Sequence, residues 1–599
     1  MRTNRLLTVL GIALVPLALL APATTASAQA AAPPRQPTAV GSGGAVSTVD
    51  PDATAIGLNV LRNGGNAVDA AIAAAAALGV TEPYSSGLGG GGFFVYYDAA
   101  TKRVHTIDGR ETAPAAFTET TFTEDGQPIA FADAVTSGLS NGVPGSPATW
   151  ARALSQWGTR SLADTLRPAA KLADAGFVVD QTFHDQTAAN QARFALFPAT
   201  AALFLPGGQA PVVGSTLRNP DLASTYRMLG KRGMAPIYGG QIGRDIVQAT
   251  QHPPLVPGST YNARPGLMTL QDLRNYRVLP RVPTHVTYHG LDVYGMAPSS
   301  SGGSTVGESL NILSSFDLRA MTDTQFYHHY LEATRLAYAD RNRYVGDPGY
   351  VAVPLKELLS TGFAHERACL IDPDHAATSP VPPGSPDGTY HTCAVQGIPA
   401  PTGVEGLNTT NLTVADKWGN VVEYTLTIEQ TGGSGITVPG RGFLLNNELT
   451  DFNFVPTQGA ARDPNLPAPG KRPRSSISPT IVLRQGRPFL ALGSPGGASI
   501  ITTVLQVLIE RLDHGRTLPE AIAAPRASQR NAPTTQAEQA FIDAQGPGLT
   551  ALGQSLVLPP DPPELGAATA IEFLGAGRLL AAAEPVRRGG GAAAVVRPE

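Results

Sequence analysis

The stretch TTNLTVADKWGNVVEYTLTIEQ, residues 409–430, decides how this chain folds. On both sides of its central turn, β-branched and aromatic residues alternate with polar ones, which is typical of a β-hairpin. A three-residue loop in the turn pairs Asp416 with Asn420, and the same register pairs Thr409 with Thr427. We therefore expect a hairpin whose open end carries a polar cluster with two threonine hydroxyls.

The position of Thr409 in the chain suggests chemistry for one of these hydroxyls. A threonine hydroxyl is a weak nucleophile unless a base lies beside it, and the residue's own α-amine serves once the chain is cut just before it. Residues 372–406 are rich in Pro, Gly, Ser and Thr, which predicts an exposed linker directly upstream. On this evidence alone, Thr409 as an ordinary strand residue remains the simpler interpretation.

A glycine-rich turn later in the chain supplies a second catalytic element. The sequence GSPGG at residues 493–497 follows an apolar strand pattern at 489–492 and opens a predicted helix at 498–512. Unpaired backbone N–H groups at a helix start can hold a developing oxyanion. The alternative is a tight turn between strand and helix with no chemical role.

Three further segments carry charges and hydroxyls that suit an amino-acid substrate. Arg110 can hold a carboxylate through paired hydrogen bonds. The segment KRPRSS at 471–476 adds hydroxyls and positive charge, and NNELTD at 446–451 adds carboxylates. Arginine and serine fit the carboxylate of an α-amino acid, and the acidic side chains fit its ammonium group.

The composition excludes several other classes of protein. Hydrophobic residues make up 42% of the 599, so the chain is not disordered. With 43 Lys and Arg against 47 Asp and Glu, the net charge is −4, which disfavours a nucleic-acid partner. The length by itself suggests several domains, and the 65 Gly and 52 Pro indicate a globular protein rich in loops.

The N-terminal residues 1–30 have the order of a secretory signal peptide. Arg2 and Arg5 precede an apolar run at 6–20 and a small-residue stretch at 26–30. An uncleaved anchor is the alternative, although the run is short for a bilayer span. We expect a secreted protein that has no membrane segment once the signal is removed.

The two cysteines, Cys369 and Cys393, are predicted to form a disulfide in such an oxidising compartment. The eleven histidines show no zinc-binding spacing. We therefore expect neither a metal nor any other cofactor.

Ahead of these elements, two consecutive helices are predicted at 52–65 and 66–78, with Asn66 capping the second. A glycine run at 87–92 then leads into a strand pair at 93–97 and 103–108. The run precedes a strand and lacks the Lys-Ser/Thr of a phosphate-binding loop, so a close-packed turn is favoured.

Taken together, these motifs resemble the γ-glutamyltranspeptidase family of N-terminal nucleophile hydrolases. The most specific matches are GGNAVDAA at 64–71, DGRETAP at 108–114, Thr409-Thr410, LLNNELTDF at 444–452 and GSPGG at 493–497. The resemblance implies an α+β fold, a four-layer αββα sandwich. It also implies a precursor that cuts itself between Asn408 and Thr409, so that a large subunit, 31–408, and a small subunit, 409–599, stay associated as one domain.

The resemblance also implies the activity. Mature Thr409 would attack the γ-glutamyl amide of glutathione or related compounds and pass the acyl group to water or to an acceptor amino acid or peptide. Carried over by position, the carboxylate site is Arg110, Ser475 and Ser476, and the ammonium site is Glu429, Glu448 and Asp451. Thr427 would orient the nucleophile, and Gly496 and Gly497 would form the oxyanion hole.

Some positions depart from the family pattern. Asn411 stands in place of a usual histidine, Arg474 in place of leucine, and Gly432 in place of an aromatic residue. These changes bear on the rate of processing and on acceptor preference. Residues 453–470 would hold any lid over the site, and their length leaves the presence of a lid open.

Two alternative functions remain at this point. One is a relative that acts on glutaryl or other side-chain amides, such as a cephalosporin acylase; a glutaryl group has no amine for the acidic residues to bind. The other is a non-catalytic secreted binding protein, against which Thr409 and the paired glycines argue.

Overall fold

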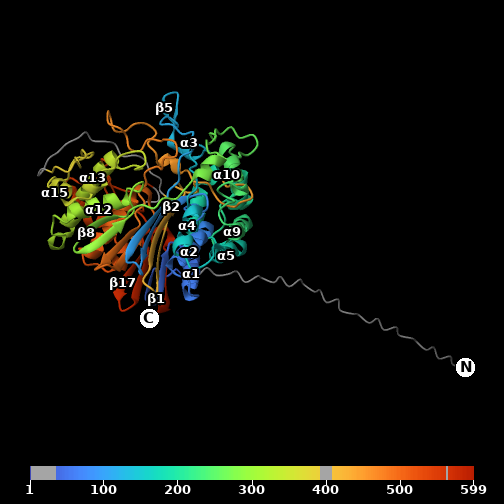
Figure 1. Ribbon diagram of the computed structural model, residues 1–599, viewed down its shortest axis with the longest axis horizontal. Helices are drawn as coiled ribbons and strands as arrows, with labels where there is room; N and C mark the ends of the chain where they lie inside the picture. The colour runs from blue at the N-terminus through green and yellow to red at the C-terminus, as the bar shows by residue number, and fades with distance from the viewer. Residues whose placement is uncertain (2–34, 391–407, 561–563) are drawn as a thin grey trace. The chain divides into compact units, whose positions relative to one another are not determined.

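The computed structural model describes Met1 and residues 35–390, 408–560 and 564–599 (Figure 1). The predicted signal peptide therefore lies almost wholly outside the described residues. All the elements below belong to one compact unit that spans Ala32–Glu599.

Strand β1, Thr38–Thr48, belongs to both layers of a folded sheet. Its first half pairs with β18, Arg578–Ala583, and its second half pairs with β10, Thr410–Asp416. Between the halves, Gly43 and Gly44 adopt positive φ angles of 82° and 127°, a conformation that glycine tolerates. The bend lets one hydrogen-bonded sheet turn over and pack against itself.

The strands follow one another in the order β3-β2-β11-β10-β1-β18-β17-β13-β12-β9-β8, and β19 also pairs with β1. Their bounds are β2 Gly91–Asp98, β3 Arg103–Gly109, β8 Thr284–Tyr288, β9 Leu291–Gly295, β11 Val421–Thr427, β12 Thr480–Arg484, β13 Arg487–Gly493, β17 Thr569–Gly575 and β19 Ala592–Pro598. Strands β10 and β11 of one layer contact β17 and β13 of the other. This contact forms the middle of the fold.

Helices cover the outer face of each layer (Figure 1). On β10 and β11 lies α2, Ala67–Thr81, flanked by α1 Pro51–Arg62, α4 Ser146–Trp157, α5 Leu162–Ala175 and α9 Pro220–Arg232. On the other layer lie α12 Gly302–Leu313, α13 Asp323–Tyr344 and α16 Ile500–Leu512. The result is the predicted four-layer αββα sandwich.

Shorter elements complete the unit. The helices are α3 Phe131–Val135, α6 Gln181–Ala189, α7 Gln191–Phe194, α8 Pro198–Phe204, α10 Gln241–Gln251, α11 Leu270–Asn275, α14 Leu355–Leu358, α15 Thr361–Ala368, α17 Leu518–Ala523 and α18 Gln539–Ala551. The strands are β4 Thr123–Glu124, β5 Gln127–Pro128, β6 Phe177–Val178, β7 Thr216–Leu217, β14 Ala527–Ser528, β15 Thr535–Ala537 and β16 Leu556–Val557. No helix in the described ranges is both long and apolar enough to cross a membrane.

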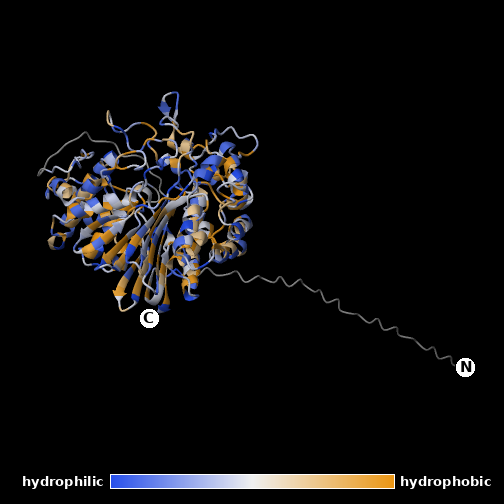
Figure 2. Ribbon diagram, in the orientation of Figure 1, coloured by the Kyte–Doolittle hydropathy of each residue, from blue (hydrophilic) through white to orange (hydrophobic). Residues whose placement is uncertain are grey.

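The fold has two hydrophobic cores, and side chains that alternate along each strand contribute to one core or the other. Leu412 and Val414 of β10 belong to the core that contains α2, whereas Phe93 and Val95 of β2 belong to the core shared with the second layer. Successive residues of a strand point to opposite faces, so each strand contributes to both cores. Figure 2 shows hydrophobic residues along the strands and hydrophilic ones gathered around outer helices such as α10.

The start of α2 is as predicted. The Asn66 side chain accepts a hydrogen bond from the Asp69 backbone N–H at 3.0 Å, and the Asp69 carboxylate accepts one from the Asn66 N–H at 2.9 Å. This reciprocal capping box begins a helix that is buried along its whole length. Its run of alanines allows the helix to lie close to the sheet.

The glycine run at 87–92 is a close-packed turn, as predicted. A Cβ atom on Gly89 would lie 1.9 Å from the Leu444 carbonyl oxygen, and one on Gly90 would lie 2.1 Å from the Thr427 carbonyl oxygen. No side chain fits at either position. Because these glycines have no side chains, the backbone of the glycine run can pack directly against the backbone at Thr427 and Leu444.

Two expectations about the middle of the chain have different outcomes. Residues 372–390 form no helix or strand, and 372–375 and 387–389 are exposed as their composition predicts, but the stretch around Pro383–Pro386 is largely buried. Gly384 is buried and donates to Asp340 at 2.6 Å, and Arg367 donates to the Pro382 carbonyl at 3.1 Å, because the segment packs on α13 and α15. The predicted disulfide stays a prediction, since Cys393 lies outside the described residues.

Candidate active site

The hairpin register brings Thr409 and Thr427 together. Thr410 pairs with Leu426 and Ala415 with Val421, the register that a three-residue loop predicts. The Thr409 Oγ1 lies 3.4 Å from the Thr427 Oγ1, and the Thr409 side chain is almost completely buried. Because β10 begins and β11 ends here, both hydroxyls lie at one edge of the first sheet layer.

Both hydroxyls also face the peptide that joins Asn408 to Thr409. The Asn408 carbonyl oxygen accepts from Thr409 Oγ1 at 2.7 Å and from Thr427 Oγ1 at 3.1 Å. Thr427 Oγ1 in turn accepts from the Glu429 backbone N–H at 2.8 Å, which fixes the hydroxyl's orientation. The hydroxyl of Thr409 is thus held against the carbonyl group of the residue before it.

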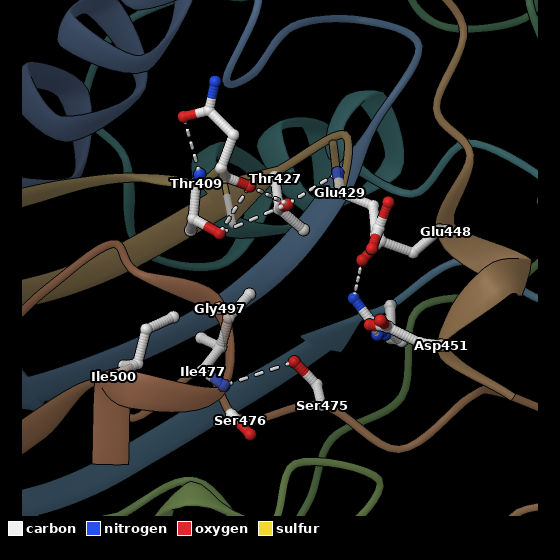
Figure 3. A pocket seen from close by; sticks show the side chains of 12 residues that line it. Thr409, Thr427, Glu429, Glu448, Asp451, Ser475, Ser476, Ile477, Gly497 and Ile500 are labelled. Carbon is white, nitrogen blue, oxygen red and sulfur yellow. Dashed lines mark hydrogen bonds and ion pairs between the residues drawn. The ribbon is translucent and has the colours of Figure 1, made fainter. Parts of the chain in front are cut away.

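These threonines lie in a pocket that collects most of the predicted site residues. It is lined by Arg110, Asn408, Thr409, Thr427, Glu429, Glu448, Asp451, Ser475, Ser476, Ile477, Gly497 and Ile500. Figure 3 shows the two threonines together, Glu429, Glu448 and Asp451 to one side, and Ser475, Ser476 and Gly497 across the pocket. Of the predicted residues, only Gly496 is not among the lining.

One guanidinium and three carboxylates make up the charged part of the pocket. Arg110 forms buried ion pairs with Glu448 and Asp451. Burial raises the pKa of Glu429 well above its usual value, and the neighbouring Asp451 and Glu448 charges raise it further. With three acidic groups facing one arginine, the pocket favours an additional positive charge.

Glu429 is held in an unusual backbone conformation. Its φ is 79°, which is uncommon for a residue with a side chain, and its carboxylate accepts a hydrogen bond from Asn447. The opposite oxygen, Oε1, is buried and has no hydrogen-bond partner among the described residues. A buried, unpaired carboxylate oxygen in a pocket wall is ready to accept from a ligand ammonium group.

Arg110 was expected to hold the carboxylate of a substrate. In the structure Arg110 lines the pocket but already pairs with Glu448 and Asp451, two of the three carboxylates that were expected to bind the ammonium group. A substrate with an α-carboxylate and an α-ammonium group would therefore bind beside ion pairs that already exist, and Arg110 would contact both its carboxylate and these acidic side chains. Tyr276 donates to the Arg110 carbonyl at 2.8 Å and fixes the backbone at this position.

The serine pair lies on the opposite wall. The Ser475 backbone N–H donates to Ser299 at 3.1 Å, and Ser301 donates to the Ser475 carbonyl at 2.7 Å, so the loop before α12 holds this segment. Arg341 of α13 donates to Ser476 Oγ at 2.8 Å. The two serines are therefore positioned by the second layer and its helices.

The other charged residues of the KRPRSS segment do not enter the pocket. Lys471 donates to the Pro464 and Leu466 carbonyls at 2.8 and 2.7 Å. Arg472 pairs with Asp108, and Arg474 reaches carbonyl groups at the end of α13, including that of Val345 at 3.3 Å. Of this segment, only Ser475 and Ser476 line the pocket, although the Pro473 and Arg474 carbonyls accept from the Arg110 guanidinium at 3.3 and 3.1 Å.

The paired glycines follow β13, as predicted, and a short 3-10 turn, Gly497–Ser499, leads into α16. Their φ angles of 133° and 55° are positive, a conformation that glycine adopts more readily than other residues. No described residue accepts a hydrogen bond from the backbone N–H of Gly496 or Gly497. Gly497 lines the pocket, which makes its N–H a candidate donor to an oxyanion there.

The departures from the family pattern have structural counterparts. Asn411 is buried between the sheet layers, where it donates to Glu423 at 2.5 Å and to Thr569 at 2.8 Å. Gly432 lies against the ring of Phe194, 2.5 Å from where a Cβ would be, so an aromatic ring from α7 already fills this space. None of residues 453–470 lines the pocket.

Several residues at the site were not predicted from the sequence. Ser85 and Arg588 contact Asn408, and Arg341 contacts Ser476. Their positions lie 323, 180 and 135 residues from their partners, so spacing along the chain gives no signal for them. The Arg587-Arg588 pair before a glycine run was the only local cue for Arg588.

A two-layer sheet between helical layers, with a buried threonine directly before an inner strand, is the arrangement of the N-terminal nucleophile hydrolase class. The family model for gamma-glutamyltranspeptidase matches residues 53–595. The chain therefore belongs to the γ-glutamyltranspeptidase family.

Individual relatives include both hydrolases and acylases. The chain is 40% identical to the glutathione hydrolase proenzyme of Bacillus subtilis (strain 168) over 527 residues, 86% of each chain. It is 34% identical to the acylase ACY 1 proenzyme of Pseudomonas sp. (strain SE83), over 91% of this chain and 92% of the relative. The crystal structure of cephalosporin acylase from Bacillus halodurans has a TM-score of 0.80 at 28% identity, covering 94% and 97% of the two chains.

Proposed function

We propose that this protein is a self-processing γ-glutamyltransferase and glutathione hydrolase. The observation that carries the proposal is the placement of the Thr409 hydroxyl 2.7 Å from the Asn408 carbonyl oxygen, in a pocket with one guanidinium and three carboxylates. The first feature suits self-cleavage, and the second suits a substrate that carries both an α-carboxylate and an α-ammonium group.

Self-cleavage would begin with attack of Thr409 Oγ1 on the Asn408 carbonyl carbon. The new C–O bond replaces the C–N bond, and the hydroxyl proton passes to the Thr409 nitrogen, which gives an ester and a free amine. Water then hydrolyses the ester to an Asn408 carboxylate and restores the hydroxyl. Thr427 supports the step because its hydroxyl is within 3.1 Å of the carbonyl oxygen on which negative charge develops.

The free amine of Thr409 would then act as the base for its own hydroxyl. Attack on the γ-carbonyl of a γ-glutamyl amide forms a γ-glutamyl ester on Thr409 and releases the amine portion of the substrate. The Gly496 and Gly497 N–H groups would stabilise the oxyanion. Water releases glutamate, whereas the amine of an acceptor amino acid or peptide gives a new γ-glutamyl amide.

The charged pocket would hold the glutamyl end of the substrate. Arg110, Ser475 and Ser476 are assigned to its carboxylate, and Glu429, Glu448 and Asp451 to its ammonium group. Arg110 comes from the segment before the cleavage point and the others from the segment after it. Subunits 31–408 and 409–599 would therefore have to stay associated for the site to exist.

We further infer that residues 1–30 direct the protein out of the cytoplasm and are then removed. This assignment depends on the order of basic, apolar and small residues alone. N-terminal sequencing of the exported protein tests it, with a start near residue 29 or 31 expected. A mature protein that retains the apolar run would contradict it.

The acylase relatives make a side-chain amidase the second candidate. The two candidates differ in whether the substrate carries an α-ammonium group, for which Glu429 and its neighbours provide an acidic wall. Turnover of γ-glutamyl anilide against glutaryl anilide, with and without an acceptor dipeptide, separates them. We expect strong preference for the γ-glutamyl compound and stimulation by the dipeptide; preference for the glutaryl compound would favour the acylase.

A further inference from the structure

Arg588 contacts both residues of the Asn408–Thr409 peptide. Its Nη1 donates to the Thr409 carbonyl oxygen at 2.5 Å, and its Nη2 donates to the Asn408 side-chain Oδ1 at 2.6 Å. A planar guanidinium presents its donors in a fixed fork, so these two bonds set the distance and angle between their acceptors. Neither acceptor is an atom that reacts.

The Asn408 side chain is fixed by several donors at once. Its Oδ1 accepts from Ser85 Oγ at 2.9 Å and from the Thr409 backbone N–H at 3.1 Å, in addition to Arg588. Its Nδ2 donates to Thr431 Oγ1 at 3.1 Å. With its side chain immobilised in this way, Asn408 presents its backbone carbonyl to the Thr409 hydroxyl in one orientation.

Arg588 is itself held in place. Its φ of 55° is a left-handed value that residues with side chains adopt rarely, and Gly589 and Gly590 continue with positive φ. The Arg588 backbone N–H donates to Glu564 at 2.8 Å. Its guanidinium also donates to Ser85 at 2.9 Å and lies 3.7 Å from the Glu82 carboxylate at the end of α2.

We propose that Arg588 is a positioning residue for self-cleavage, which clamps the two sides of the Asn408–Thr409 peptide so that the Thr409 hydroxyl faces the Asn408 carbonyl. This role rests on the self-processing proposed above. The Arg588 guanidinium is balanced by Glu82, yet both of these short hydrogen bonds reach oxygens on either side of one peptide bond, which places Arg588 to hold that peptide. Loss of the clamp frees the Asn408 side chain and the peptide to rotate away from the attack geometry.

The neighbouring Arg587 provides a matched control. It is also buried, but it pairs with Glu538 and Glu584 and has no contact with the Asn408–Thr409 peptide among the described residues. Arg587→Gln should therefore lower Tm without changing how fast the folded precursor splits. Arg588→Gln should slow the splitting roughly 10- to 100-fold, the effect of losing a charge-assisted hydrogen bond.

The experiment follows conversion of freshly synthesised precursor on denaturing gels, with circular dichroism and Tm to establish folding. Wild type, Arg588→Gln, Arg588→Lys, Arg588→Ala and Arg587→Gln are compared, and Thr409→Ala serves as the uncleaved reference. We expect slow splitting of Arg588→Gln, partial recovery in Arg588→Lys, and acceleration of Arg588→Ala by millimolar guanidinium, about a thousandfold below denaturing concentrations. Recovery by an added cation is not expected of a residue with a structural role alone.

The possible results distinguish failure of the Arg588 clamp from failure of self-processing itself. If wild type splits, and Arg588→Gln splits at the wild-type rate or slows only as much as Arg587→Gln, the clamp is wrong and self-processing stands. If folded wild type does not split, or Thr409→Ala splits, self-processing itself is wrong and the clamp falls with it.

Discussion

The hydroxyl oxygens of Thr409 and Thr427 lie 3.4 Å apart, and both are within hydrogen-bond distance of the Asn408 carbonyl oxygen. The same three groups therefore meet at the proposed point of self-cleavage, where Thr409 is the proposed nucleophile. This arrangement follows from strand pairing, since Thr410 and Leu426 are the neighbouring pair in the ladder.

If the Thr427 hydroxyl takes part in catalysis, removing it should lower kcat even when the shape of the side chain is kept. Thr427→Val keeps the size and branching of the side chain but removes the hydroxyl, so kcat should fall roughly 100-fold or more, as for loss of one oriented hydrogen-bond group. Thr427→Ser should retain most of the rate. Steady-state assays of protein that has already split measure this, and equal rates for the Val and Ser variants would remove the hydroxyl from the mechanism.

Asp451→Asn tests the acidic wall of the pocket. The amide keeps the shape but removes one of the charges assigned to the substrate ammonium group, so KM for a γ-glutamyl anilide should rise at least tenfold. KM for a glutaryl anilide, which has no ammonium group, should rise less or fall. An equal rise in both KM values would mean that Asp451 does not bind the substrate's ammonium group.

Glu423 predicts a pH dependence of stability. Burial between the sheet layers raises its pKa well above the usual 4.5, although hydrogen bonds from Asn411 and Thr413 oppose the shift. The folded state therefore keeps a proton that the unfolded state releases, so this contribution to stability is present below the unfolded pKa and is lost as pH rises toward the folded pKa.

Glu423→Gln removes this titration and keeps an oxygen that accepts from Asn411. The Tm of the variant relative to wild type should increase between about pH 5 and about pH 8, by an amount that corresponds to about 1.4 kcal/mol for each unit of pKa shift. Thermal unfolding across this range measures it. A constant difference in Tm at every pH would contradict the assignment of the proton to Glu423.

In the glycine run, Gly90 is a position near the site where any side chain would disturb the backbone. In Gly90→Ala the new Cβ would meet the Thr427 carbonyl oxygen at 2.1 Å, so the end of β11 must shift, at a cost of about 1–3 kcal/mol for overpacking. We expect lower Tm together with lower kcat. Gly126→Ala, at a positive-φ turn with open space around it, is the control that should affect Tm alone.

Much of the fold could be predicted from the sequence because it depends on local patterns. The hairpin register follows from alternation and loop length, and the start of α2 follows from Asn66 as its N-cap. The contacts of Arg588 and Arg341 could not be predicted, because they join segments that only the packing of sheet layers and helices brings together. Within 372–390, only the part near Gly384 departs from the predicted exposed linker, since a composition poor in apolar residues does not exclude local burial through hydrogen bonds to Asp340 and Arg367.

The charges of the site show the same limit. The sequence indicated that Arg110 and the acidic residues would meet, but it assigned them to opposite ends of a substrate. The structure pairs Arg110 with Glu448 and Asp451 directly. Only a three-dimensional arrangement reveals which charges already satisfy one another before a ligand binds.

The central claim is that Thr409 becomes a chain terminus, and intact-mass analysis with N-terminal sequencing of the purified protein tests it most directly. We predict two chains, the smaller beginning at Thr409 and containing 599 − 408 = 191 residues, and a single uncut chain in Thr409→Ala. A folded, active wild-type protein that remains one chain, or whose smaller fragment begins at another residue, would contradict the account.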